Sequence, residues 1–160
     1  GVRVLNLYVV NGKEVGTDKY EHKLEWLKGV TAHIEQTLAS TSRLVVVGDF
    51  NIAPEDRDVH DPVAWQGSVL VSEPERQRFR SLLDCGFRDT LREFDQSDGQ
   101  FSWWDYRGGG FRRNHGLRID LVLASESLSK DCTASIVDKA PRSWERPSDH
   151  APVMAEFSCT

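Results

Sequence analysis

The chain has 160 residues, of which 39% are apolar and 28% are charged, and these values are typical of one globular domain or a piece of one. No apolar run approaches the roughly 18–20 residues that cross a bilayer, so we expect no membrane partner. A net charge of −5 argues against a nucleic-acid partner unless a metal site concentrates the acids, because nucleic acids are bound largely through phosphate neutralisation. The cysteines Cys85, Cys132 and Cys159 lack CxxC spacing, which argues against a zinc site or a disulfide framework and favours the reducing cytoplasm.

The first part of the chain predicts a strand, a helix and a second strand. Residues 2–10 have the pattern of a strand. Asp18 and Glu21 have capping-box spacing, and apolar residues then recur at helical spacing over residues 18–39. Residues 43–50 form a near-continuous apolar run, which is typical of a strand buried on both faces.

The remainder predicts one more helix and several strands. Ser72 and Glu75 form a second capping box at the start of a helix, and Gly86 is the stop signal at the end of that helix. Further strands are expected at residues 101–104, 117–124, 133–138 and 151–157. Strands that first alternate with helices and then follow one another indicate a single α/β domain, with a mixed sheet covered by helices on one face.

Two long stretches, residues 52–71 and 105–116, lack a clear period, and we expect them to be functional loops. The second belongs to a segment, residues 101–118, that holds a single acid and four arginines: Arg107, Arg112, Arg113 and Arg118. A solvated surface loop is the plainer interpretation of such a run. The neighbouring pair Trp103-Trp104 favours contact with nucleic acid, because aromatic rings stack on bases, although most tryptophan pairs belong to a core.

Gly48-Asp49-Phe50-Asn51 stands at the exit of the apolar strand. Because side chains alternate along a strand, we expect Asp49 and Asn51 to point to the same side. An aspartate there can hold a metal ion or activate a water molecule, and an asparagine can orient that water. A plain turn is the alternative, since both residue types are common in turns.

Ser148-Asp149-His150 is the second acidic motif. Adjacent residues of an extended segment face opposite ways, so we expect Asp149 and His150 to have separate partners. A histidine beside a phosphate needs a carboxylate that fixes its tautomer. The candidate is Asp120, which interrupts an apolar strand and requires a partner there. A structural pair of Asp120 with an arginine is the alternative.

Two further residue groups are less specific. Tyr8 lies near the end of the first strand, where a half-buried strand tyrosine is the plainer interpretation. The remaining histidines have no partners at ligand spacing, and we interpret them as surface residues: His22, His33, His60 and His115.

Four strings of residues resemble bacterial exonuclease III, in the abasic-site endonuclease branch of the endonuclease/exonuclease/phosphatase superfamily. They are Gly48-Asp49-Phe50-Asn51-Ile52-Ala53-Pro54, Phe101-Ser102-Trp103-Trp104-Asp105-Tyr106-Arg107, Gly116-Leu117-Arg118-Ile119-Asp120 and Pro147-Ser148-Asp149-His150-Ala151-Pro152. The resemblance implies a four-layered α/β sandwich with two facing sheets. It also implies hydrolysis of DNA phosphodiesters next to abasic sites and from 3′ ends.

The resemblance also implies catalytic roles. Asp49 is similar to the residue that activates the attacking water, and Asn51 helps to orient it. His150, held by Asp120, contacts the phosphate. Tyr8 stabilises the phosphate or the leaving group.

The cofactor implied is Mg²⁺ or Mn²⁺, with Asp49, Asn51 and Asp149 on the metal side. Double-stranded DNA is the implied partner, contacted by Asn11, Trp103, Arg107, Arg112, Arg113, Leu117 and Ile119. Within this set, Trp103, Leu117 and Ile119 resemble an apolar pocket that receives a flipped-out abasic sugar.

The chain departs from the family at its front. It starts at Gly1 and lacks roughly the N-terminal hundred residues of a family that forms one compact domain, among them an asparagine and the principal glutamate ligand of the metal. We therefore expect a weak metal site. We also expect an exposed sheet face through which the chain self-associates.

Two alternatives remain at the level of sequence. The first is a phosphatase or phospholipase of the same superfamily, against which the Trp- and Arg-rich loop argues. The second is a catalytically idle fragment that binds nucleic acid in a salt-sensitive manner without need of a metal.

Overall fold

The computed structural model describes residues 1–158, so Cys159 lies outside the described residues. The strands are β1 (Arg3–Tyr8), β2 (Leu44–Asp49), β3 (Phe87–Asp89), β4 (Asp120–Ser125), β5 (Cys132–Val137) and β6 (Val153–Phe157). The α-helices are α1 (Asp18–Ser40), α2 (Pro62–Trp65), α3 (Glu73–Asp84), α4 (Thr90–Phe94), α5 (Gly110–Arg113) and α6 (Glu126–Ser129). Short 3₁₀ turns span Asp56–Asp58, Arg107–Gly109 and Ala140–Ser143.

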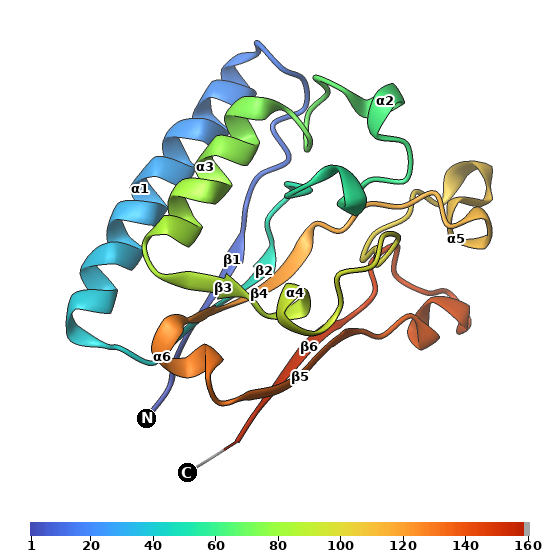
Figure 1. Ribbon diagram of the computed structural model, residues 1–160. Coiled ribbons are helices and arrows are strands. Elements are labelled where there is room, and N and C mark those ends of the chain that lie inside the picture. Colours follow the sequence, from blue (N-terminus) through green and yellow to red (C-terminus); the bar gives the residue numbers. More distant parts are fainter. Residues whose placement is uncertain (159–160) are drawn as a thin grey trace.

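The centre of the molecule is a four-stranded mixed sheet in the order β1-β2-β4-β3. β1 runs parallel to β2, whereas β4 is antiparallel to both β2 and β3. β5 and β6 form a separate antiparallel pair. In Figure 1, α1 and α3 lie side by side against the four-stranded sheet. The α/β class and the mixed sheet agree with the prediction.

Two apolar layers hold this arrangement together. The layer between the helices and the sheet includes Leu27 and Ile34 of α1, Phe79 and Leu82 of α3, and Val46 of β2. The second layer joins the opposite face of β2 and β4 to β6. The central strands are therefore covered on both faces, as the continuous apolar pattern of residues 43–50 predicted.

The helix starts illustrate how local sequence acts. Ser72 and Glu75 form the predicted capping box at the start of α3. For α1 the predicted box was wrong: the capping residue is Thr17, whose hydroxyl accepts the backbone N–H of Tyr20 at 3.4 Å. Asp18 is already the first helical residue, where its negative charge suits the positive end of the helix dipole.

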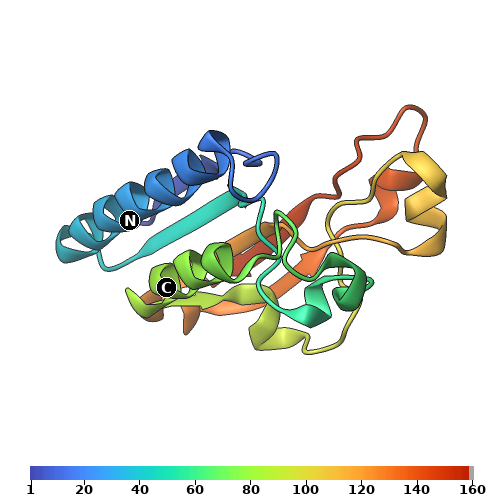
Figure 2. The same ribbon diagram turned by 90° about the horizontal axis from the view of Figure 1, so that it is seen from above.

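Three other local predictions require correction. Residues 101–104 do not form a strand, because only Trp103 makes isolated bridges, one to Leu117 and one to His150. β4 begins at Asp120 rather than at Leu117. The long stretches 52–71 and 105–116 contain the short helices α2 and α5. Figure 2 places α5 and the segment before β6 at the same end of the molecule.

Within residues 1–158, none of the helices combines the length and the apolarity that a bilayer crossing requires. Cys85 and Cys132 are half-buried free thiols.

Candidate active site

A row of three side chains crosses the four-stranded sheet at one end. Tyr8 pairs with Asp49 in the β1–β2 ladder, and Asp49 pairs with Asp120 in the β2–β4 ladder. Side chains at paired positions of neighbouring strands point to the same face of a sheet. Asp49 and Asp120 are half-buried, whereas Tyr8 is 65% exposed. Residues separated by 41 and 71 positions in the sequence thus lie next to one another.

Gly48 determines how closely β1 approaches β2 beside this row. Its φ angle is +131°, and a Cβ atom there would lie 1.9 Å from the carbonyl oxygen of Leu7. No L-residue with a side chain fits that position without displacing the backbone of β1. Glycine before Asp49 is therefore a requirement of the strand pairing itself.

Asp49 and Asn51 meet, but for a different reason from the predicted alternation. Asn51 has a φ angle of +47°, so the chain turns after β2 instead of continuing as a strand. The turn lets the Asn51 backbone N–H donate to Asp49 Oδ1 at 2.8 Å and Nδ2 donate to Asp49 Oδ2 at 3.0 Å. Nδ2 also donates to the Val9 carbonyl at 2.8 Å, and Asn51 Oδ1 accepts from Asn11 Nδ2 at 3.3 Å.

The environment of Asp49 disfavours its negative charge. Burial raises the pKa of Asp49 to about 6, and the charge of Asp120 adds to this effect. The backbone N–H of Asn51 and the charges of His150 and Lys23 oppose it. Two neighbouring carboxylates in a partly buried position repel each other, and a bound cation would stabilise their negative charges.

His150 is fixed on Asp120. Nδ1 of His150 donates to Asp120 Oδ2 at 2.8 Å, which leaves Nε2 as the other ring nitrogen. The hydroxyl of Ser102 donates to the same carboxylate oxygen at 2.7 Å and accepts the backbone N–H groups of Ile119 and Asp120. Burial alone would lower the pKa of His150. The hydrogen bond and charge of Asp120 outweigh it, with help from Asp49, so the pKa is raised.

Asp149 faces a different partner from its neighbour. Its Oδ2 atom accepts the indole N–H of Trp103 at 2.9 Å. Among the described residues, the acids and histidines whose ligand atoms could share one cation are Asp49, Asp120 and His150, with all three ligand atoms within 4.8 Å of one another. Asp149 is not a member of that group, so its metal role and that of Asn51 stay predictions.

The proposed apolar pocket is closed in this structure. Leu117 and Ile119 are 0% and 2% exposed and belong to a buried cluster that also contains Val59 and Ala53. Trp103 packs against this cluster and is partly exposed. The three predicted pocket residues are thus brought together, and only Trp103 offers surface to a ligand.

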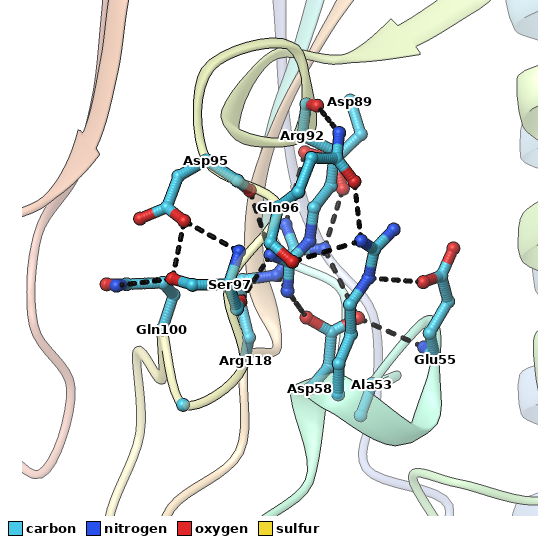
Figure 3. A network of polar contacts seen from close by, with 12 residues as sticks. Ala53, Glu55, Asp58, Asp89, Arg92, Asp95, Gln96, Ser97, Gln100 and Arg118 are labelled. Carbon is cyan, nitrogen blue, oxygen red and sulfur yellow. Dashed lines mark hydrogen bonds and ion pairs between the residues drawn. The ribbon is translucent and has the colours of Figure 1, made fainter.

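Arg118 does not belong to the basic surface to which its sequence position assigns it. Figure 3 shows Arg118 and Arg92 converging on Asp58. Nε of Arg118 donates to Asp58 at 2.6 Å, and its terminal nitrogen donates to Asp89 at 2.7 Å. Arg118 is only 1% exposed, so it cannot reach a phosphate. Its ion pairs with Asp58 and Asp89 instead join loops around the site.

The other arginines of the segment remain at the surface. Arg112 and Arg113 are exposed on α5, and Arg107 is exposed and paired with Asp105 at 2.7 Å. Trp104, in contrast, is 0% exposed, and its indole N–H donates to Asn114 at 3.1 Å. The pair of tryptophans is therefore divided between core and surface.

Two of the histidines interpreted as unpartnered surface residues interact with each other. The rings of His60 and His115 stack with centroids 4.9 Å apart, and Nδ1 of His60 lies 3.2 Å from the Gly116 carbonyl oxygen. His22 and His33 are exposed on α1, as predicted.

Lys23 and Ser102 were missed as contributors to the site. Lys23 is buried and bonds to the Asn51 carbonyl at 2.7 Å. A signal for it existed in the sequence, because Lys23 follows Tyr20 by three positions and precedes Leu27 by four. This spacing places it on the apolar face of α1. Ser102 carried no comparable signal, since its role depends on the distant strand β4.

Comparisons with known proteins identify relatives of the whole chain. The sequence pattern of the Endonuclease/Exonuclease/phosphatase family matches residues 2–150. Exodeoxyribonuclease III of Haemophilus influenzae is 32% identical over 162 residues, which cover 96% of this chain and 61% of that protein. A solved 3′ phosphatase from Neisseria bound to a product DNA hairpin is 42% identical with a TM-score of 0.97, and the match covers 99% of this chain and 62% of that one. An AP endonuclease from Archaeoglobus fulgidus is 34% identical with a TM-score of 0.92, over 98% of this chain and 61% of that one. The chain therefore spans about three fifths of the length of these relatives.

Proposed function

Because this chain belongs to the endonuclease/exonuclease/phosphatase family, we propose that it carries the catalytic residues of a DNA-repair nuclease. The reaction is hydrolysis of DNA phosphodiesters, beside abasic sites and at 3′ ends. One observation carries the proposal: Tyr8, Asp49 and Asp120 stand in one row across the sheet, with His150 fixed on the last of them. The similarity to an exodeoxyribonuclease III and to an AP endonuclease supports the choice of substrate.

The proposed cofactor is Mg²⁺ or Mn²⁺, and the donor set fits such an ion. Carboxylate oxygens are the ligands that these hard cations prefer, and the carboxylates of Asp49 and Asp120 lie close together. Since Asp120 is already engaged by His150 and Ser102, Asp49 is the ligand best supported by geometry. Asn51 and Asp149 complete the proposed metal side. Such an ion, when bound, would supply Lewis-acid chemistry at the phosphate.

The side chains of the chain supply the remaining chemistry. Asp49 takes the proton of the attacking water, whose oxygen bonds to phosphorus, and Asn51 orients that water. His150 donates from Nε2 to a phosphate oxygen, because Asp120 keeps Nδ1 occupied. Tyr8 stabilises the departing sugar oxygen as its bond to phosphorus breaks.

The proposed DNA-binding surface lies around the loop 105–116. Arg107, Arg112 and Arg113 are exposed and can neutralise phosphates. Asn11 is exposed beside the row and contacts a phosphate. Trp103 provides the exposed edge of the proposed sugar pocket. Leu117 and Ile119 can line that pocket only after the buried cluster opens. Duplex DNA with an abasic site or a 3′ end is the proposed partner.

A second candidate reaction is removal of a terminal 3′ phosphate. The observation that favours it is the 42% identity to a protein described as a 3′ phosphatase. The same residues would serve, because in both cases water attacks phosphorus and a sugar oxygen departs; a terminal phosphate only lacks the second sugar ester.

We also propose that copies of the chain associate through the exposed sheet face at β1. This strand is at the edge of the sheet; its Val4 and Tyr8 are 59% and 65% exposed, and Val2, just before it, is 47% exposed. Exposed apolar side chains on a sheet face favour association with a second copy. Sedimentation of the parent and of Val4→Lys tests this, with a loss of dimer expected in the variant.

For localisation we propose the cytoplasm, on the free thiols of Cys85 and Cys132.

The first experiment is a nicking assay on duplex DNA with one abasic site, beside a duplex with a 3′ phosphate. The chain is tested with Mg²⁺ and with a chelator, in parallel with Asp49→Asn. Asp84→Asn is the matched control, because Asp84 is an exposed acid at the end of α3. We expect metal-dependent hydrolysis that only the Asp49 variant loses.

Three outcomes would contradict the proposal. Activity that persists in Asp49→Asn would exclude Asp49 as the base or ligand. An unchanged rate in Asn51→Ala would exclude the role given to Asn51. A folded chain that binds DNA without hydrolysing either duplex would establish the idle binding fragment instead.

A further inference from the structure

The side chain of Lys23 is fully buried where α1 meets the loops that carry the candidate site. Its ammonium group has three N–H donors, and three acceptors surround it. The carbonyl oxygens of Asn51 and Asn11 lie 2.7 Å and 3.1 Å from Nζ, and a carboxylate oxygen of Glu75 is the third acceptor. All the donors of this buried cation are therefore used on two loop carbonyls and one acid.

The two carbonyls belong to the loops that leave the parallel strands β1 and β2. Asn51 is the more demanding of them, because its φ angle of +47° lies in the left-handed region, which is disfavoured for residues with a side chain. Asp49 accepts the N–H groups of Asn51, and Lys23 donates to its carbonyl oxygen. The peptide unit that follows Asn51 is thus held by Lys23.

Glu75 gives Lys23 a fixed position. Its carboxylate also accepts the backbone N–H groups of Leu70 at 3.1 Å and Ser72 at 3.2 Å. The hydroxyl of Tyr20 lies 2.6 Å from the hydroxyl of Ser72, which closes the network back onto α1. The ammonium is thereby tied to the first turn of α3 as well as to the two loops.

Stability alone does not account for this cation. Replacing a buried ion pair by apolar residues of similar volume is often neutral or stabilising. Lys23 stands on the apolar face of α1, where an aliphatic side chain would suit the helical pattern. An aliphatic side chain, however, offers no donors to the carbonyls of Asn11 and Asn51.

We propose that Lys23 is a positioning residue, which sets the backbone of Asn51 and thereby the orientation of the Asn51 amide and the Asp49 carboxylate. The effect on hydrolysis rests on the proposed function. The effect on the loops does not, since it concerns the free protein.

The test uses three variants. Lys23→Met removes the donors and keeps the length of the aliphatic stem. Lys23→Met/Glu75→Gln removes the unpaired buried charge that the single variant leaves, so a folded protein is available if the single variant unfolds. Tyr20→Phe is the matched control, because it breaks a bond at the far end of the same network and leaves the three bonds of Lys23 in place.

Hydrogen exchange of the metal-free protein is the first readout. The backbone amide of Asn51 donates to the Asp49 carboxylate, and that of Val9 donates to the Asp49 backbone carbonyl, each at 2.8 Å. We expect their protection to fall about tenfold or more in both Lys23 variants, with the β2 amide of Val46 unchanged in the double variant, because local openings need not involve the core. Equal protection at Asn51 and Val9 in parent and variants, or a uniform loss that includes Val46 in the double variant, overturns the proposal.

Steady-state hydrolysis is the second readout. We expect kcat to fall about tenfold to a hundredfold in the Lys23 variants with KM nearly constant, since misplacement of a reacting group acts on the chemical step. Tyr20→Phe should keep the parent kcat. A full kcat in the Lys23 variants overturns the link to the reaction. A parent that hydrolyses nothing refutes the proposed function, and exchange then decides the positioning alone.

Discussion

Replacement of Gly48 by alanine is expected to damage both the fold and the site. At a φ angle of +131°, a residue with a side chain is strained by about 1–3 kcal/mol. The new methyl carbon would also lie 1.9 Å from the Leu7 carbonyl oxygen, so β1 must move away from β2. Overpacking of this kind costs about 1–3 kcal/mol. The combined loss of about 2–6 kcal/mol is a large part of the 5–15 kcal/mol that stabilises a typical domain.

Urea denaturation of Gly48→Ala, followed by circular dichroism, measures this loss. Gly29→Ala is the matched control, because Gly29 lies in α1 and a Cβ there would meet nothing within 4 Å. That control should gain about 1 kcal/mol, since alanine is the better helix former. A Gly48→Ala protein within about 1 kcal/mol of the parent would refute the argument from close strand approach.

The remaining predictions concern charged residues. Asp58→Asn should lose about 3–5 kcal/mol of stability in denaturation at pH 7, because the buried charges of its arginine partners lose their counterion. Burial alone would raise the pKa of Asp58, but these arginines lower it below 3.8. The stabilisation that the charged Asp58 gives the folded state is therefore complete above that pH. The gap between parent and variant should therefore close as the pH falls through the lowered pKa, and a gap that is constant down to pH 2 would contradict this assignment. Asp120→Asn should lower kcat about 10²-fold or more in the nicking assay without unfolding the chain. The pair Arg112→Ala/Arg113→Ala should reduce the slope of log K against log salt by up to about 2 in DNA titrations, whereas Arg80→Ala, an exposed change on α3, should leave it unaltered.

The sequence alone determined those features that depend on local pattern. The apolar run of β2 with Asp49 at its exit, the helical period of α1 and the capping box of Ser72 are all in the structure, because each is set by residues a few positions apart. The pairing of His150 with Asp120 was also foreseeable, since a carboxylate inside an apolar strand demands a partner.

Only the tertiary structure decided which distant residues share the site. The register of β1, β2 and β4 aligns Tyr8, Asp49 and Asp120, and a shift by one residue would turn each side chain to the opposite face. Arg118 appeared to belong to a basic loop, yet ion pairs with Asp58 and Asp89 bury it. Burial and strand register are properties of contacts between remote segments, so residue types and spacing cannot fix them.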